Sequence, residues 1–296
     1  MKLEKKFISG VLIGLLGIIL FSSKAVLVKL VYNYNVDAIT TLLLRMLFSF
    51  PFYVIIAILY RNEKRAEEKN QQKDYVWVLF FGIVGYYLAS YFDFVGLTYI
   101  KASLERIILF IYPTIVLVFN KWFLKKPINK HQKIAILITY IGIIVTFGNE
   151  VSLSGKTIYI GGFYVVLSAI TYASYLVGSG WLIPKFGVMR FTAYAMLVSC
   201  ICVFIHFGLQ ATTNILDLPF EVYILGFCIA IFATVIPSFL VSISIKMISS
   251  SNFAIIAAIG PISTILLAFL FLDERLTVTQ VIGTIIVILG VLNVKK

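Results

Sequence analysis

The sequence predicts an all-α, polytopic membrane protein whose ten transmembrane helices form two inverted five-helix repeats. Three observations predict this fold. Hydrophobic residues make up 61% of the 296-residue chain and charged residues only 13%, whereas about a quarter of the residues of a soluble domain are charged. The apolar stretches are long enough to cross ~30 Å of hydrocarbon as helices. The second half of the chain also repeats the first in outline.

Ten apolar stretches, separated by polar, charged or Gly/Pro clusters, are the predicted spans. In chain order they cover 7–31, 38–60, 75–97, 103–122, 131–148, 158–182, 190–209, 221–245, 251–271 and 278–294. Their apolar residues are continuous rather than alternating, which favours helices over the strands of a membrane barrel. The first stretch is too long for the core of a secretory signal and no small-x-small cleavage site follows it, so we expect a retained helix.

The cations of the chain indicate how these spans are oriented. They gather in the N-terminus, the even-numbered connections and the C-terminal tail, while the odd-numbered connections hold only Lys101, Lys156 and Arg275. Connections rich in Lys and Arg lie on the cytoplasmic side. Both termini are therefore predicted to be cytoplasmic, in a multi-pass protein of the cell membrane. The net charge of +12 is then an orientation signal, and we expect no nucleic-acid partner.

The repeat appears when the chain is shifted by half of its 296 residues. Identical residues then coincide, among them Ser103 with Ser251, Pro113 with Pro261, Gln132 with Gln280 and Gly142 with Gly290. This divides the chain into a first repeat over 1–148 and a second over 149–296. Each repeat holds five spans, an odd number, so the second enters the membrane from the opposite side. Such inverted repeats are typical of carriers that open alternately to each side.

At this point the sequence resembles a known family. The features that carry the resemblance are a proline in the fourth span of each half and, in the second copy, Ser249 to Asn252, Pro261, Leu272-Asp273-Glu274-Arg275, Gln280, Gly283 and Gly290. They are similar to the EamA-type branch of the drug/metabolite transporter superfamily. The first copy departs from this pattern, with Lys126 where Glu274 stands and Ala135 where Gly283 stands. The resemblance implies a carrier of amino acids or other small metabolites, driven by a proton or exchange gradient, and we expect export.

Other classes of protein fit the sequence less well. The two histidines, His131 and His206, belong to no paired-ligand motif, and no GxSxG or Walker motif is present. We therefore expect no enzyme, no catalytic residue, no metal and no cofactor. A receptor or assembly subunit that does not transport would not need two inverted halves, but it stays an alternative. The expected partners are a small-molecule solute and the lipid bilayer, and a homodimer is left open.

Six charged residues remain inside the spans of the first repeat once the basic connections are set aside. Lys29 lies near the outer end of its span and is expected to extend to the interface, which leaves Lys24, Arg45, Asp93, Glu105 and Arg106. At 1.5 Å of rise per residue, all five lie roughly 5–12 Å below the outer surface. Their counterparts in the second repeat are uncharged: Tyr172, Ala193, Val241, Phe253 and Ala254. Charges within spans are costly and usually face a cavity or a partner, so this layer is the candidate site.

The five charges sum to an excess of +1, which favours an anionic solute, because Arg offers a bidentate fork and Lys a point charge. We expect an amino acid or another carboxylate-bearing solute, with a cationic or hydrophobic drug as the alternative. Lys24 and Arg45, with Tyr91 and Tyr172, are the predicted solute-binding residues. The tyrosines also have a structural interpretation, in interfacial belts or helix contacts.

Asp93, Glu105 and Arg106 are the predicted gating or ion-pair residues. Asp93 is expected to pair with Lys24 or Arg45. Neighbouring residues on a helix point about 100° apart, so Glu105 and Arg106 are not expected to pair with each other. They also fit the interfacial start of the fourth helix. The predicted helix kinks lie at Pro113, Pro237 and Pro261.

Overall fold

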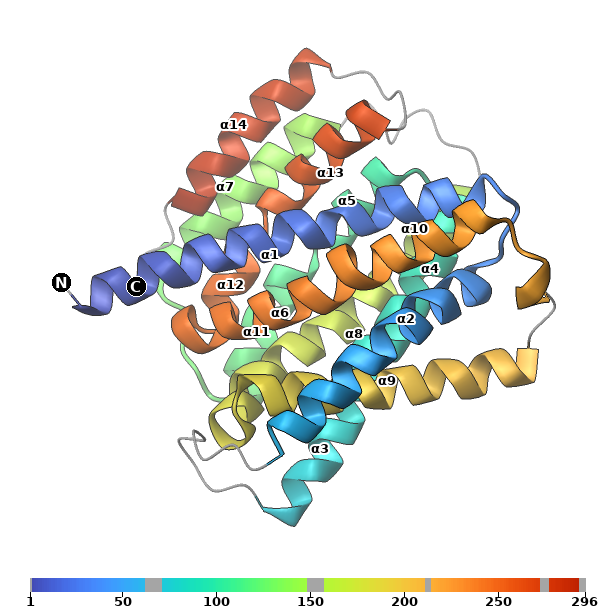
Figure 1. Ribbon diagram of the computed structural model, residues 1–296. Coiled ribbons are helices and arrows are strands. Elements are labelled where there is room, and N and C mark those ends of the chain that lie inside the picture. Colours follow the sequence, from blue (N-terminus) through green and yellow to red (C-terminus); the bar gives the residue numbers. More distant parts are fainter. Residues whose placement is uncertain (1, 62–70, 148–156, 211–213, 272–276, 293–296) are drawn as a thin grey trace.

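The computed structural model describes residues 2–61, 71–147, 157–210, 214–271 and 277–292, and all of their regular elements are helical (Figure 1). The predicted all-α membrane fold is confirmed. Seven helical stretches in this part of the chain are long and apolar enough to cross a membrane. The other three predicted spans, 103–122, 131–148 and 278–294, correspond to shorter helices, so length and composition support seven of the ten.

The same order of elements occurs in both halves. The first half contains α1 (Lys2–Tyr32), α2 (Ala38–Leu59), α3 (Gln72–Gly82), the π-helical η1 (Ile83–Leu88), α4 (Ala89–Tyr99), α5 (Ala102–Leu109), α6 (Tyr112–Phe123) and α7 (Lys130–Phe147). The second contains α8 (Thr157–Phe186), α9 (Val188–Gln210), the short 3₁₀-helix η3 (Ile215–Asp217), α10 (Phe220–Ala230), the π-helical η4 (Ile231–Val235), α11 (Ile236–Ile248), α12 (Ser250–Ile256), α13 (Ile259–Phe271) and α14 (Val278–Leu292). Two predicted spans, 103–122 and 251–271, are each broken into two helices.

Local sequence explains several helix ends. Asp37 caps α2, where its Oδ1 accepts hydrogen bonds of 2.9 Å from the backbone N–H groups of Ile39 and Thr40. The three prolines predicted as kinks stand at helix starts. Pro113 and Pro237 occupy the first turns of α6 and α11, and Pro261 stands just inside α13. A proline is tolerated there because the first turn needs no N–H donor.

Helix packing follows the repeat. α1 packs along α11 and α13, and its counterpart α8 packs along α4 and α6, while α2 meets α9 and α7 meets α14 (Figure 1). A Cβ atom on Gly142 would lie 2.8 Å from the Gly283 carbonyl oxygen, and one on Gly290 would lie 3.1 Å from that of Ala135. Residues further along α7 therefore contact residues nearer the start of α14. The two helices are antiparallel across a pseudo-twofold, as inverted repeats require.

Some sequence predictions fall on residues outside the described part of the chain. The proposed boundary between 1–148 and 149–296 is one of them, so the exact division stays a prediction. Asp273, Glu274 and Arg275, which contribute to the family resemblance, are others.

Two π-helical turns occupy matching positions in the halves. η1 lies between α3 and α4, and η4 lies between α10 and α11, half the chain length further on. A π-turn inserts one extra residue into a helix and is frequent at functional sites. Tyr86 in η1 and Thr234 in η4 are counterparts under this shift, and both are buried near the centre of the molecule.

Candidate functional site

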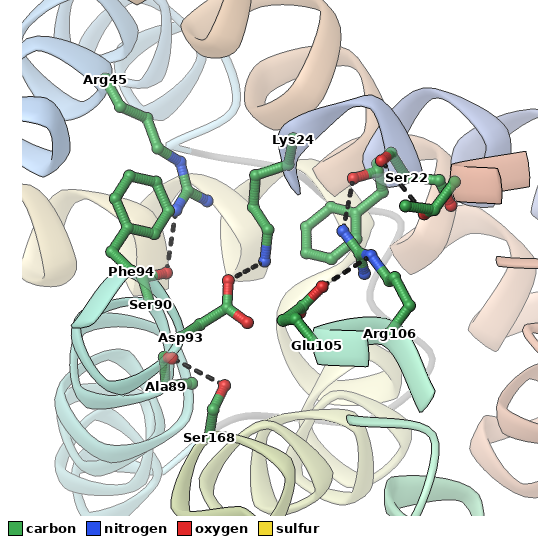
Figure 2. Close-up of polar contacts among 12 residues, drawn as sticks. Ser22, Lys24, Arg45, Ala89, Ser90, Asp93, Phe94, Glu105, Arg106 and Ser168 are labelled. Atoms are coloured by element: carbon green, nitrogen blue, oxygen red, sulfur yellow. Dashed lines mark hydrogen bonds and ion pairs between the residues drawn. The ribbon is translucent and has the colours of Figure 1, made fainter. Parts of the chain in front are cut away.

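The five charged residues predicted to share a layer do come together in the interior. They project from α1, α2, α4 and α5 toward one another (Figure 2), and each residue is at most 5% exposed. Four helices of the first half thus concentrate charge where neither water nor lipid reaches it. Tyr172 of α8 borders this cluster and packs a stacked ring on Phe21, with centroids 5.9 Å apart.

Lys24 and Asp93 form a buried ion pair that joins α1 to α4. The Lys24 ammonium donates to Oδ2 of Asp93, while Oδ1 has no hydrogen-bond partner in the described ranges of the chain. The same ammonium lies 4.9 Å from the centroid of the Phe21 ring, within the range of a cation–π interaction. Lys24 and Arg45 were the two partners expected for Asp93, and it is Lys24 that pairs with it.

Glu105 and Arg106 also make an ionic contact, so the expectation that these neighbours would not pair was wrong. Nε of Arg106 lies 3.2 Å from Oε2 of Glu105, although the angle is not that of a hydrogen bond. Both side chains are long and are excluded from solvent. The nearest opposite charge available to each is therefore the other. Nη2 of Arg106 donates to the Phe21 carbonyl at 3.3 Å, and its guanidinium carbon lies 5.6 Å from the Phe21 ring centroid.

Among the residues that the structure describes, Arg45 has only neutral hydrogen-bond partners. Its Nε donates to Thr234 Oγ1 at 2.7 Å and its Nη1 to Ser90 Oγ at 3.0 Å, while the buried Nη2 has no partner. The rings of Tyr86 and Phe94 lie 5.9 and 5.5 Å from the guanidinium carbon. Because Tyr86 and Thr234 are counterparts in the two π-turns, Arg45 lies where the halves meet. Lys24 and Arg106 each have a carboxylate, so the surplus positive charge of the cluster is on Arg45.

Two adjoining cavities border the cluster, and Phe21, Leu109 and Tyr172 line both. The first, of about 20 Å³, is also lined by Lys24, Tyr86, Ser90 and Ser168. The second, of about 30 Å³, contains Arg106 and Ser22 among mainly apolar and aromatic residues, including Tyr112, Phe253 and Pro261. Phe21 therefore separates a polar compartment on the Lys24 side from a largely apolar one beside Arg106.

Not every predicted residue joins this site. Tyr91 packs against His206 of α9, with ring centroids 4.8 Å apart. It lines neither cavity, and of the five charged residues only Lys24 and Arg106 line one. Phe21 and Thr234 contact the charged side chains but were not predicted from the sequence. Nothing in their local sequence marks them, since Phe21 sits in an unbroken apolar run and the π-turn that aims Thr234 has no sequence signature. Within the described residues, no group of three His, Cys, Asp or Glu side chains is arranged to hold a metal.

Known proteins resemble this chain over nearly its whole length. The model of the EamA-like transporter family matches residues 8–148 and 159–294. An uncharacterized transporter of Bacillus subtilis, YcbK, is 31% identical over 93% of this chain and 89% of its own. A Synechocystis uncharacterized transporter, sll1319, is 26% identical over 97% of this chain and 94% of its own. One solved crystal structure superimposes with a TM-score of 0.74 over 96% of both chains at 14% identity, so the fold is shared.

Proposed function

Because this chain belongs to the EamA-like transporter family, we propose that it exports a small carboxylate-bearing solute, such as an amino acid, across the cell membrane by alternating access. Membrane transport is the activity of the family. The class of cargo, the direction and the mechanism are our proposal. The basic cytoplasmic connections support an orientation with both termini inside.

The observation that carries the proposal is the surplus charge on Arg45. This guanidinium is buried, and within the described part of the chain it has no anionic partner and its Nη2 has no hydrogen bond. A buried donor without a partner is costly, and a carboxylate would satisfy it with a charge-assisted hydrogen bond. Figure 2 shows the guanidinium facing the Lys24–Asp93 pair, so a carboxylate bound there also lies near the Lys24 ammonium.

The cavities suggest how the rest of the solute binds. In this structure each compartment has room for about one water molecule, so the solute would enter when the halves separate. The compartment beside Lys24, lined by Ser90 and Ser168, would then take the polar end of a small molecule. The compartment beside Arg106, lined mainly by apolar side chains, would take an apolar end. A solute with a polar and an apolar end would extend across Phe21, whose ring separates the two compartments. Ligand sites commonly combine an apolar lining with a few convergent polar groups.

The ion pairs supply the outer gate in this mechanism. The Lys24–Asp93 pair joins α1 to α4, and Arg106 joins α5 to the backbone of α1 at Phe21. Opening toward the outside separates these helices, and the carboxylate of the solute replaces part of the lost interaction. The inverted halves then exchange outward-open and inward-open shapes around the central site. Either a proton or a counter-solute drives the cycle, and Asp93 and Glu105 are the carboxyl groups in the site able to take up a proton.

A ligand-induced thermal shift tests the class of cargo. The purified protein is heated with amino acids, organic acids and cationic drugs in parallel, and we expect stabilisation by carboxylate-bearing compounds. Arg45→Gln should abolish that shift, whereas Lys101→Gln, at an exposed position outside the site, should leave it unchanged. Stabilisation by cationic drugs alone would refute the carboxylate assignment and favour the drug-carrier alternative. Efflux and uptake by reconstituted vesicles then decide the direction, and absence of both would favour a non-transporting receptor or assembly subunit.

A further inference from the structure

A large apolar groove lies on the opposite side of α8 from the charged cluster. It has a volume of about 640 Å³ and runs between α3 with η1, α6 and α8. Six aromatic residues dominate its lining: Trp77, Phe80, Phe81, Phe119, Phe123 and Trp181. Several of these side chains are exposed at the surface of the protein. The groove therefore opens sideways toward the bilayer.

The position of the tryptophans assigns the groove to the cytoplasmic leaflet. The three tryptophans of the chain are Trp77, Trp122 and Trp181. Each lies close to the end of α3, α6 or α8 that the basic connections place on the cytoplasmic side. Tryptophan is enriched at the membrane–water interface, where its ring sits at the level of the lipid head groups. Trp77 and Trp181 pack edge to face at 5.5 Å, at the cytoplasmic end of the groove.

The chain next to this end of the groove is strongly basic. Lys73, Lys121 and Lys125 are exposed and lie within four residues in the sequence of Trp77, Phe123 and Leu124, which line the groove, although none of the three lysines lines it. Lys185 lies 4.8 Å above the Trp181 ring and pairs with Asp74 at 2.9 Å. The counterparts of these lysines under the half-chain shift are acidic or apolar, namely Glu221, Phe269, Asp273 and, for Lys185, Asp37 of the first half. The basic rim thus belongs to this groove and not to the repeated scaffold.

We propose that the groove between α3, α6 and α8 binds an anionic phospholipid of the cytoplasmic leaflet, with an acyl chain along its aromatic lining and the phosphate at Lys121 and Lys125. A phospholipid matches both parts of this surface, since the lining of the groove is apolar and its rim is cationic. Basic residues next to the membrane attract anionic lipids of this leaflet. The site is separate from the transport site and does not depend on the cargo. The bound lipid fills the space between two helices of the first half, α3 and α6, and one of the second, α8.

Native mass spectrometry of the full-length protein, purified in detergent, tests the lipid assignment. The probes are phosphatidylglycerol and phosphatidylcholine with identical acyl chains. We expect the wild-type protein to retain phosphatidylglycerol more tightly. The Lys121→Gln/Lys125→Gln variant should lose about fivefold in retention of the anionic lipid for each charge removed, with retention of phosphatidylcholine unchanged. Equal retention of the two lipids by the wild-type protein overturns the head-group assignment.

Filling the groove tests its location. Ile170→Trp places a large ring in the groove, whereas Ile201→Trp adds the same ring at an exposed position of α9 outside it. We expect Ile170→Trp to release the lipid and Ile201→Trp to retain it. Val84→Trp fills the groove from η1 and replaces the first variant if that one does not fold. Retention by a folded, filled variant overturns the proposal. The proposal is also overturned if the wild-type protein is a dimer that Ile170→Trp converts to monomers, because the occupant of the groove is then a second copy of the chain.

Discussion

Arg45 of the first half donates a hydrogen bond of 2.7 Å to Thr234 of the second half. Thr234 receives it at a π-helical turn, where its own hydroxyl donates to the Ile229 carbonyl at 2.8 Å. The counterpart of Thr234 is Tyr86, whose ring also contacts the guanidinium. Residues of both π-turns therefore contact Arg45. The counterpart of Arg45 in the second half, Ala193, is uncharged. The repeated scaffold thus holds between its halves one charge, that of Arg45, which the repeat does not duplicate.

The first prediction concerns this guanidinium. Arg45→Gln should weaken solute binding about thirtyfold, because a hydrogen bond to a charged group contributes about 2 kcal/mol. Arg45→Lys should also weaken binding, since an ammonium has no fork to reach Ser90 and Thr234 together. Thr234→Val keeps the charge and serves as the matched control, with a smaller loss. Concentration-dependent transport by reconstituted vesicles measures all three, and full activity of Arg45→Gln would rule out the assignment.

The second prediction concerns the buried pair of Lys24 and Asp93. Removing Lys24 alone leaves an uncompensated buried carboxylate, and we expect Lys24→Ala to destabilise the fold by about 3–5 kcal/mol. Asp93→Ala should act similarly through the unpaired ammonium. The double variant should be less destabilised than the sum of the two, because neither charge then remains. Thermal unfolding of the four proteins in detergent completes the cycle, and simple additivity would mean that the two residues are not coupled.

Much of this fold follows from the sequence, since hydropathy marks the spans and the repeat relates the halves. The shared layer of five charges also follows from it, because helix rise fixes the depth of Lys24 and Asp93 within their spans. The exact partners do not follow. A π-turn shifts every later side chain of its helix by one position, and no residue pattern announces it at Tyr86 or Thr234. Side-chain flexibility likewise allowed Glu105 to reach Arg106 despite their divergent positions on the helix.

The third prediction concerns Phe21, which separates the two cavities and contacts both Lys24 and Arg106. Phe21→Leu keeps the apolar volume but removes both cation–π contacts, each of which contributes about 0.5–2 kcal/mol. We expect this variant to be moderately less stable. Phe21→Ala should also join the two compartments and admit bulkier solutes. Competition between small and bulky solutes in a transport assay measures this change, and an unaltered preference would show that Phe21 is not the partition.

The last prediction separates the scaffold from the site. A Cβ atom on Gly142 would meet Gly283 and Val287 of α14 at 2.7–2.8 Å, largely against backbone atoms that cannot rotate away. Gly142→Leu should therefore push α7 from α14 and destabilise the fold by about 1–3 kcal/mol, the usual effect of overpacking. Gly208→Leu is the matched control, because nothing lies within 4 Å of a Cβ atom there. Solute affinity at a temperature where Gly142→Leu stays folded should match the wild type, since α7 and α14 carry none of the five buried charges. A large loss of affinity without a loss of stability would instead mean that this helix pair takes part in binding.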